Sequence, residues 1–160
     1  VLDTTVSYYH RDGEGRRDLA SLYNSDFRST LNRSIIKDIS ISLPESGETA
    51  AKFIKFSRSE FDVSALNLAC RLTVERGTIT EARLSIGARP MTGERVTDLE
   101  ENLVGEKVTE DLAESAGVSA ADLAELGGDD RLSEDYRKEL VKKMTAEALM
   151  DIKKEVANES

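Results

Sequence analysis

Alternating apolar and polar residues predict strands along the first third of the chain. Residues 1–9 are rich in β-branched and aromatic side chains, and residues 34–43 alternate more regularly before Pro44. Between them, residues 10–17 predict a turn, because they hold two glycines and alternating charges, and residues 18–27 predict a short helical or irregular piece. The buried face of the second strand is expected to consist of Ile35, Ile39, Ile41 and Leu43.

The middle of the chain predicts a second, more strongly apolar set of strands. Residues 52–57 (KFIKFS) are typical of an edge strand, and residues 63–74 form a longer apolar-rich segment. Another apolar run over 79–88 follows the turn at 75–78, whose glycine favours an antiparallel hairpin. We expect a loop at 87–93 to separate these strands from the rest of the chain.

Helix start and stop signals dominate the last part of the chain. Thr97 followed three residues later by Glu100 is a candidate capping box for a helix over 98–104. Two further short helices are expected at 109–116 and 120–126, with Gly117 ending the first.

A regular apolar stripe marks the final segment. Apolar residues recur at every fourth position, as on one face of a helix. The stripe predicts a helix of about six turns from Ser133 to about Val156, and its buried face is expected to hold Tyr136, Leu140, Val141, Met144, Ala148, Leu149 and Ile152. Strands followed by helices indicate an α+β fold, in which a helical layer covers one face of a small antiparallel sheet.

Composition and charge exclude several classes of protein. The chain has 160 residues, enough for one domain or for parts of two. Its net charge of −9 argues against nucleic-acid binding, which needs clustered Lys and Arg. No apolar run approaches the roughly 20 residues of a membrane helix, and no secretory signal opens the chain. We therefore expect a cytoplasmic protein that does not enter a membrane.

Two features bear on the extent of the protein. The linker-like stretch PESGET at 44–49 marks the expected domain boundary. The opening residues Val-Leu-Asp-Thr-Thr are typical of the middle of a strand. We expect the chain to be a domain or fragment of a longer polypeptide.

Few side chains are suited to catalysis or metal binding. Cys70 is the single cysteine and has apolar neighbours, so we interpret it as a thiol buried in a strand. His10 is the single histidine, and without a cysteine or second histidine it cannot complete a nucleophilic triad or a typical transition-metal site. The sequence therefore predicts no catalytic residue and no metal ligand.

The stretch DDRLSEDYRKELVKKM (129–144) contains polar residues at regular offsets before the long helix. Ser133 is a plausible N-cap, and the acidic residues after it complement the helix dipole. Tyr136 is expected to begin the buried stripe, and Arg137 to pair with Asp130. These residues are interpreted as a structural cap.

The pattern Asp130-x-x-Ser133-x-x-Tyr136-Arg137 also resembles the sequence that ends the C-terminal domain of the flavoprotein subunits of molybdenum hydroxylases. That family includes xanthine dehydrogenase, carbon monoxide dehydrogenase and hydroxybenzoyl-CoA reductase. Four other stretches are similar to the family and stand in its order: GEGRRDLASLY (13–23), SIIKDISISLP (34–44), KFSRSEFDVSALNLACRL (55–72) and LSIGARPMTGERVTDLEENLVG (84–105). The resemblance covers nearly the whole chain.

The resemblance implies a division of the chain and a function. Residues 1–44 would be the end of an FAD-binding domain, and residues 45–160 a domain like the C-terminal domain of the CO dehydrogenase flavoprotein. In such enzymes FAD passes electrons from two [2Fe–2S] clusters to NAD or another acceptor. The molybdenum cofactor and the clusters would lie on partner subunits, so the resemblance implies a hetero-oligomer with an iron–sulfur subunit and a molybdenum subunit. The substrate would be a purine or another N-heterocycle.

The chain departs from the family pattern in three places. The family's glutamate before the strand at 34–44 is Ser34 here, and one of its usual glycines is replaced near Gly87-Ala88. The glycine-rich stretches that hold the FAD pyrophosphate lie upstream in the family. Gly13-Glu14-Gly15 is a poor substitute, because no apolar helical pattern follows it directly.

Two residues match positions that touch flavin in the family. Lys55 matches a lysine close to the isoalloxazine ring, where a cation would stabilise the reduced flavin anion. Ile36 matches an apolar residue that contacts the ring. Each residue also has a purely structural interpretation. Lys55 would be a solvated lysine on an edge strand, and Ile36 an ordinary core isoleucine.

The loop after Lys55 approaches the flavin in the family and controls access of the electron acceptor. Arg58 and Asp62 flank this loop and are alternatively a pair that fixes its conformation. Phe61 replaces an acid found in some relatives, and an apolar side chain there would change the field at the flavin.

Two other functions compete with the oxidoreductase reading. One is a non-catalytic assembly domain that docks a flavin domain onto the other subunits and binds no cofactor itself. The other is a stand-alone α+β ligand-binding domain unrelated to flavin. The FAD content of the natural protein separates these alternatives.

Overall fold

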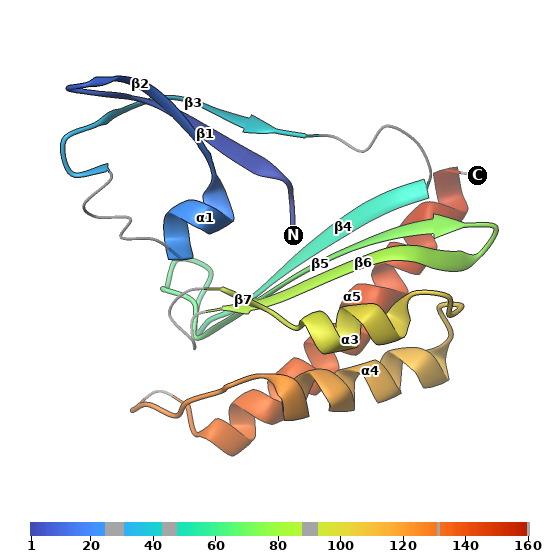
Figure 1. The fold of residues 1–160 in the computed structure, drawn as a ribbon. Helices are drawn as coiled ribbons and strands as arrows, with labels where there is room; N and C mark the ends of the chain where they lie inside the picture. The colour runs from blue at the N-terminus through green and yellow to red at the C-terminus, as the bar shows by residue number, and fades with distance from the viewer. Residues whose placement is uncertain (25–30, 43–47, 88–92, 131, 160) are drawn as a thin grey trace. The chain divides into compact units, whose positions relative to one another are not determined.

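The computed structural model describes residues 1–24, 31–42, 48–87, 93–130 and 132–159. The chain divides into two compact units, residues 2–45 and residues 46–160 together with Val1. Each unit has its own antiparallel sheet (Figure 1). The α+β fold class predicted from the sequence is confirmed.

The smaller unit is a three-stranded antiparallel sheet in the order β2-β1-β3. Its elements are β1 (Thr4–His10), β2 (Gly13–Asp18), α1 (Leu19–Asn24) and β3 (Ile35–Ile41). The predicted turn over 10–17 is wrong for its second half, because residues 13–18 form β2. The side chains of β2 are largely exposed, and the strand is defined by its pairing with β1. A strand of this kind leaves no apolar alternation in the sequence.

A β-bulge determines which side chains of β3 share a face. Ser7 of β1 pairs with Asp38, but the next residue, Tyr8, pairs with Ile36, so Lys37 is the extra residue. Paired residues point to the same side of a sheet. The bulge therefore places Ile36, Ile39 and Ile41 on the face of Val6 and Tyr8.

The predicted burial of this strand was wrong. Ile35 lies on the opposite face from Ile39 and Ile41, because the bulge interrupts the simple alternation. Ile35, Ile39 and Ile41 are 74%, 59% and 50% exposed, and Leu43 lies outside the described residues.

The larger unit has a four-stranded antiparallel sheet in the order β4-β5-β6-β7. Its strands are β4 (Glu48–Phe56), β5 (Leu66–Glu75), β6 (Thr78–Gly87) and β7 (Glu94–Arg95). The predicted hairpin is formed by β5 and β6. Arg76 and Gly77 at its tip have φ angles of 52° and 78°, as the positive-φ positions of a two-residue hairpin turn require.

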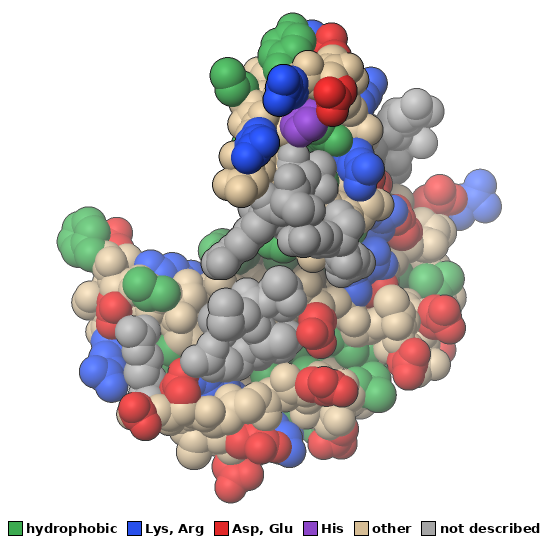
Figure 2. All heavy atoms as spheres, turned by 60° about the vertical axis from the view of Figure 1, so that its left-hand side comes forward, with side chains coloured by type: hydrophobic (Ala, Val, Ile, Leu, Met, Phe, Trp, Pro, Cys, Tyr) green, Lys and Arg blue, Asp and Glu red, His purple; other side chains and the backbone are tan. Residues whose placement is uncertain are grey.

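Helices cover one face of this sheet, as predicted (Figure 1). They are α3 (Thr97–Leu103), α4 (Glu110–Leu123) and α5 (Glu134–Glu159). α5 packs against β4 and β5, α3 packs against β6, and α4 packs against α5 and α3. The shared core includes Leu66, Leu68, Leu72, Leu84, Ile86, Leu103, Val141, Leu149 and Ile152. Acidic side chains, drawn in red, gather along the lower edge of the view in Figure 2. In α4, the exposed acidic residues include Glu110, Asp111, Glu114 and Asp122.

Gly117 does not end a helix, so the two helices predicted around it are one. α4 runs through Gly117 without a break, and this residue is buried where α4 crosses α5. A Cβ atom there would lie 2.4 Å from the backbone oxygen of Lys142. Glycine permits this close backbone approach. In the sequence, a glycine required for helix packing cannot be told from a glycine that ends a helix.

The predicted capping box at Thr97 is also wrong. The N-cap of α3 is Val96, and no side chain caps it. Glu100 is buried and accepts hydrogen bonds from Leu84 N at 2.8 Å and Arg95 Nε at 2.7 Å. The glutamate therefore ties α3 to the edge of the sheet.

Candidate functional site

Lys55 lies at the end of β4, on the face of the larger sheet that the helices leave open. Side chains of β4 alternate, so Lys52 points to the helices and forms an ion pair with Asp151 at 2.7 Å. Lys55 points the other way and is exposed. Its Nζ donates to the backbone oxygen of Glu60 at 2.9 Å. An ammonium group has three donors, so this bond leaves Lys55 with capacity for a ligand.

Two neighbours of Lys55 on the open face were missed by the sequence analysis. Phe53, two residues earlier on the same strand, is 63% exposed. Asn67 of β5 pairs with Lys55 of β4. The Asn67 Oδ1 atom is buried without a hydrogen-bond partner in the described part of the chain. An aromatic residue, a cation and an amide are therefore adjacent on one sheet face. The available signal was the alternation of β4, which puts Phe53 and Lys55 on the same side.

The loop between β4 and β5 is held by its own short hydrogen bonds. Ser57 Oγ donates to the backbone oxygen of Ser59 at 2.7 Å, and Asp62 N donates to the same oxygen at 3.1 Å. Asp62 Oδ1 accepts from Val63 N at 2.8 Å. No ion pair joins Asp62 to Arg58 in the described structure, so the predicted loop-fixing pair is wrong.

Phe61 is the most exposed large apolar residue described in this loop. Its side chain is 96% exposed, and Val63 is 71% exposed. The loop therefore presents apolar surface to solvent or to a ligand while its backbone is internally bonded.

Ile36 lies in β3 of the smaller unit, opposite Tyr8. Ile36 is 51% exposed, so it is not an ordinary core isoleucine within the described structure. Tyr8 also pairs with Gly15, where a Cβ atom would lie 2.6 Å from the tyrosine ring. The missing side chain at Gly15 therefore leaves room for the ring of Tyr8 beside Ile36.

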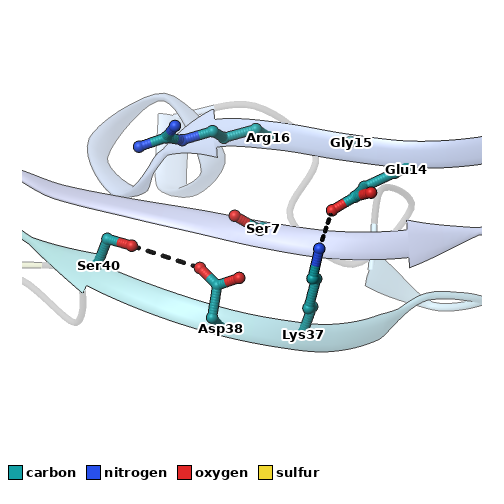
Figure 3. Close-up of a pocket in the computed structure, with 7 residues that line it drawn as sticks. All are labelled: Ser7, Glu14, Gly15, Arg16, Lys37, Asp38 and Ser40. Carbon is teal, nitrogen blue, oxygen red and sulfur yellow. Dashed lines mark hydrogen bonds and ion pairs between the residues drawn. The ribbon is translucent and has the colours of Figure 1, made fainter.

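The opposite face of the smaller sheet is polar and forms an open cavity of ≈ 550 Å³ (Figure 3). Lys37 Nζ lies 2.5 Å from Glu14 Oε1, and this contact raises the pKa of the exposed Lys37 ammonium. Ser40 Oγ donates to Asp38 Oδ1 at 3.4 Å. The cavity is lined by Ser7, Glu14, Gly15, Arg16, Lys37, Asp38 and Ser40, so its two basic residues are matched by two acidic ones. It therefore lacks the excess positive charge that a phosphate site uses.

The predicted cap before α5 is confirmed for Ser133 but not for the partner of Arg137. Ser133 Oγ accepts a hydrogen bond from Tyr136 N at 3.3 Å. Arg137 lies 2.7 Å from Asp129, so the predicted pair with Asp130 is wrong. Tyr136 is 47% exposed, and the fully buried residue at the start of the helix is Arg137. The periodicity placed the buried stripe one residue too early at this end.

The remaining reactive side chains form no catalytic arrangement within the described residues. Burial raises the pKa of the Cys70 thiol to about 12, so the thiol stays protonated at neutral pH. His10 Nδ1 lies 3.3 Å from Asp12 at the surface. No group of His, Cys, Asp and Glu suited to a metal ion occurs in the described ranges. None of the described helices is long and apolar enough to cross a membrane.

The two ends of a flavin need different surroundings, and the described residues suit them unequally. In the larger unit, Lys55 and Phe53 are both exposed on one sheet face, and a cation with apolar surface suits a flat ring that gains negative charge. In the smaller unit, Ile36 is exposed as well. The pyrophosphate end needs a glycine-rich loop at a helix N-terminus. Gly13 and Gly15 instead belong to β2 and pair with β1. Gly13 and Gly15 therefore form no pyrophosphate site.

Comparison with solved structures shows the same fold. Quinoline 2-oxidoreductase from Pseudomonas putida 86 is similar with a TM-score of 0.80 and 21% identity, over 94% of this chain and 52% of that chain. Carbon monoxide dehydrogenase from Hydrogenophaga pseudoflava is similar with a TM-score of 0.82 and 18% identity, over 96% of this chain and 53% of that chain. Reconstituted CO dehydrogenase from Oligotropha carboxidovorans is similar with a TM-score of 0.78 and 17% identity, over 93% of this chain and 52% of that chain. The chain thus spans about half the length of these relatives.

Comparison by sequence identifies a family. No curated protein matches the chain. Residues 51–152, well over half of the chain, match the family described as the CO dehydrogenase flavoprotein C-terminal domain. This match confirms the resemblance to the flavoprotein subunits of molybdenum hydroxylases. The chain belongs to the family of the CO dehydrogenase flavoprotein C-terminal domain.

Proposed function

We propose that this chain is part of the FAD-carrying subunit of a molybdenum-containing hydroxylase or dehydrogenase. The observation that carries the proposal is the family match over residues 51–152, together with an exposed lysine on the open face of the matched domain. FAD, when bound, would pass electrons from [2Fe–2S] clusters to NAD or another acceptor. The clusters and the molybdenum cofactor would belong to partner subunits in a cytoplasmic hetero-oligomer.

The substrate would be an N-heterocycle such as a purine. Quinoline, in the name of one protein of the same fold, is an N-heterocycle, whereas two others reported above are named as carbon monoxide dehydrogenases. Substrate oxidation would take place on the molybdenum subunit, away from the residues of this chain.

Residues 1–44 would complete the FAD-binding domain, and residues 45–160 would form the C-terminal domain. Lys55 would hold its ammonium beside the ring of the flavin and stabilise negative charge gained on reduction. Ile36 would supply apolar contact, since half of its side chain is exposed. Phe61 would shield part of the ring and so affect which acceptor reaches it.

The test is the midpoint potential of the flavin in the complete subunit with Lys55→Met. Removing the cation takes away stabilisation of the negative charge gained on reduction, so the potential should fall by about 30 mV. For a two-electron couple, about 30 mV corresponds to about 1.4 kcal/mol. Lys52→Met is a matched control on the same strand, since Lys52 points to the helices and pairs with Asp151. An unchanged potential in Lys55→Met would remove this lysine from the flavin site.

A second function is supported by the self-contained core of residues 46–160. This unit packs its helices on its own sheet and holds no metal-binding cluster among its described residues. Such a unit suits a docking domain that binds no cofactor by itself. Purified complete subunit without FAD would favour this alternative.

A further inference from the structure

The loop between β4 and β5 is closed at its base by one backbone hydrogen bond. Ala65 N donates to Phe56 O at 2.8 Å, so the last residue of β4 and the residue before β5 are joined. Lys55 directly precedes Phe56, and its Nζ is bonded to Glu60 O within the same loop. The position of the Lys55 ammonium therefore depends on the conformation of this base.

Arg137 holds the exit of the loop. Its side chain is 1% exposed, and Nη1 donates to Ala65 O at 2.6 Å. Nη2 lies 2.7 Å from Asp129 Oδ1. The planar guanidinium can reach two partners at fixed angles, whereas an ammonium group is a single compact charge. Arg137 thus connects the loop to the segment that precedes α5.

The segment before α5 is itself fixed. Asp129 Oδ1 accepts from Leu132 N at 3.1 Å, and Asp129 N donates to Leu132 O at 3.0 Å. The adjacent Ser133 caps the helix. The carboxylate that faces Arg137 is therefore held in place by two backbone hydrogen bonds and a helix cap.

Tyr136 contacts the entrance of the same loop. Its ring meets the ring of Phe56 edge-on, with centroids 6.2 Å apart and an angle of 68° between the planes. This is a favourable aromatic arrangement. Two consecutive residues of α5 therefore contact both ends of the loop base, Tyr136 at Phe56 and Arg137 at Ala65.

We propose that Tyr136 and Arg137 form a clasp that positions Lys55 for its contact with the flavin ring. The inference rests on the proposed function of Lys55. The clasp sets the base of the loop, the base orients Lys55 and the Glu60 carbonyl, and these two groups fix the ammonium. Tyr136 and Arg137 are positioning residues in this account, since neither needs to touch the ring.

A purely structural role for the clasp makes a different prediction. If Arg137 only stabilises the domain, its replacement lowers the unfolding temperature but leaves the flavin potential of the folded enzyme unchanged. A positioning role moves the potential as well, through the altered position of Lys55.

The experiment compares midpoint potentials of the flavin in the complete enzyme for Lys55→Met, Arg137→Lys and the double variant. Arg137→Lys keeps the positive charge and removes the two-pronged geometry, so a direct effect of charge on the flavin is avoided. Gly117→Ala is the control, because it disturbs the contact of α4 with α5 at Lys142 rather than the loop. If Arg137→Lys does not fold, Tyr136→Leu replaces it, since Tyr136 is half exposed.

The clasp predicts that Arg137→Lys lowers the potential in the same direction as Lys55→Met. It also predicts that this shift disappears when Lys55 is already methionine, and that Gly117→Ala causes none. A shift from Lys55→Met alone, with none from Arg137→Lys, overturns the clasp and leaves the proposed function standing. Additive shifts in the double variant also overturn it, because Arg137 would then act independently of Lys55. No shift from Lys55→Met overturns the flavin role of Lys55 and the clasp together.

Discussion

The two sheets differ in how their apolar faces are covered. In the larger unit, Leu68 and Leu84 point from the sheet into helices of the same unit and are at most 1% exposed. In the smaller unit, Ile36 and Ile39 point from a comparable face and remain more than half exposed. Burial of apolar surface is the main stabilising term in folding. The comparison indicates that the larger unit contains its own core and that the smaller one needs further apolar surface.

The largest expected difference between the units is in their ability to fold alone. We expect residues 46–160 alone to unfold cooperatively in urea, because their core is internal. Residues 1–45 alone should remain largely unfolded, since a three-stranded sheet with one uncovered strand buries little apolar surface. Circular dichroism and amide proton dispersion measure both. A stably folded 1–45 fragment would contradict the comparison.

Truncating one apolar residue in each sheet should sharpen the difference. Leu68→Ala should lower the free energy of unfolding by about 3 kcal/mol, because it leaves a cavity in a close-packed core. Ile39→Ala should change it by less than about 0.5 kcal/mol, as for other exposed positions. Urea denaturation of the 160-residue chain measures both values. Similar losses at the two positions would show that β3 is covered.

Adding a methyl group at one close contact in each unit should give the smallest difference in stability between the units. Gly117→Ala should cost about 2 kcal/mol, because the new Cβ would meet the backbone of Lys142 and two helices would have to move apart. Gly15→Ala should cost less than about 1 kcal/mol, since the new atom meets the Tyr8 ring, which can turn. Thermal unfolding compares the two variants. A larger loss at Gly15 would contradict the interpretation that the smaller sheet is less tightly packed.

The sequence predicted the elements whose patterns come from burial. The β5–β6 hairpin and the stripe along α5 were found because one of their faces lies in the core. β2 was missed because its stability comes from backbone pairing with exposed side chains. The bulge at Lys37 was missed because it is a property of the pairing with β1, and it moved Ile36 onto the face of Ile39.

Long-range contacts also limited the prediction of the site. Glu100 matched a local capping pattern, but its partners are Leu84 and Arg95 at the sheet edge. Arg137 has an acidic neighbour at either of two positions, and the loop geometry selects Asp129. Lys55 could be singled out by resemblance, whereas its link to the first turn of α5 required the structure. The flavin roles of Lys55 and Ile36 remain predictions.

The central claim is that the protein containing this chain is a flavoprotein, and its visible absorption spectrum tests that claim most directly. The complete gene product should be purified together with its co-eluting subunits. The account predicts flavin absorption bands that bleach on reduction and return on exposure to an electron acceptor. A colourless, folded complete protein would contradict it and leave the docking domain as the function.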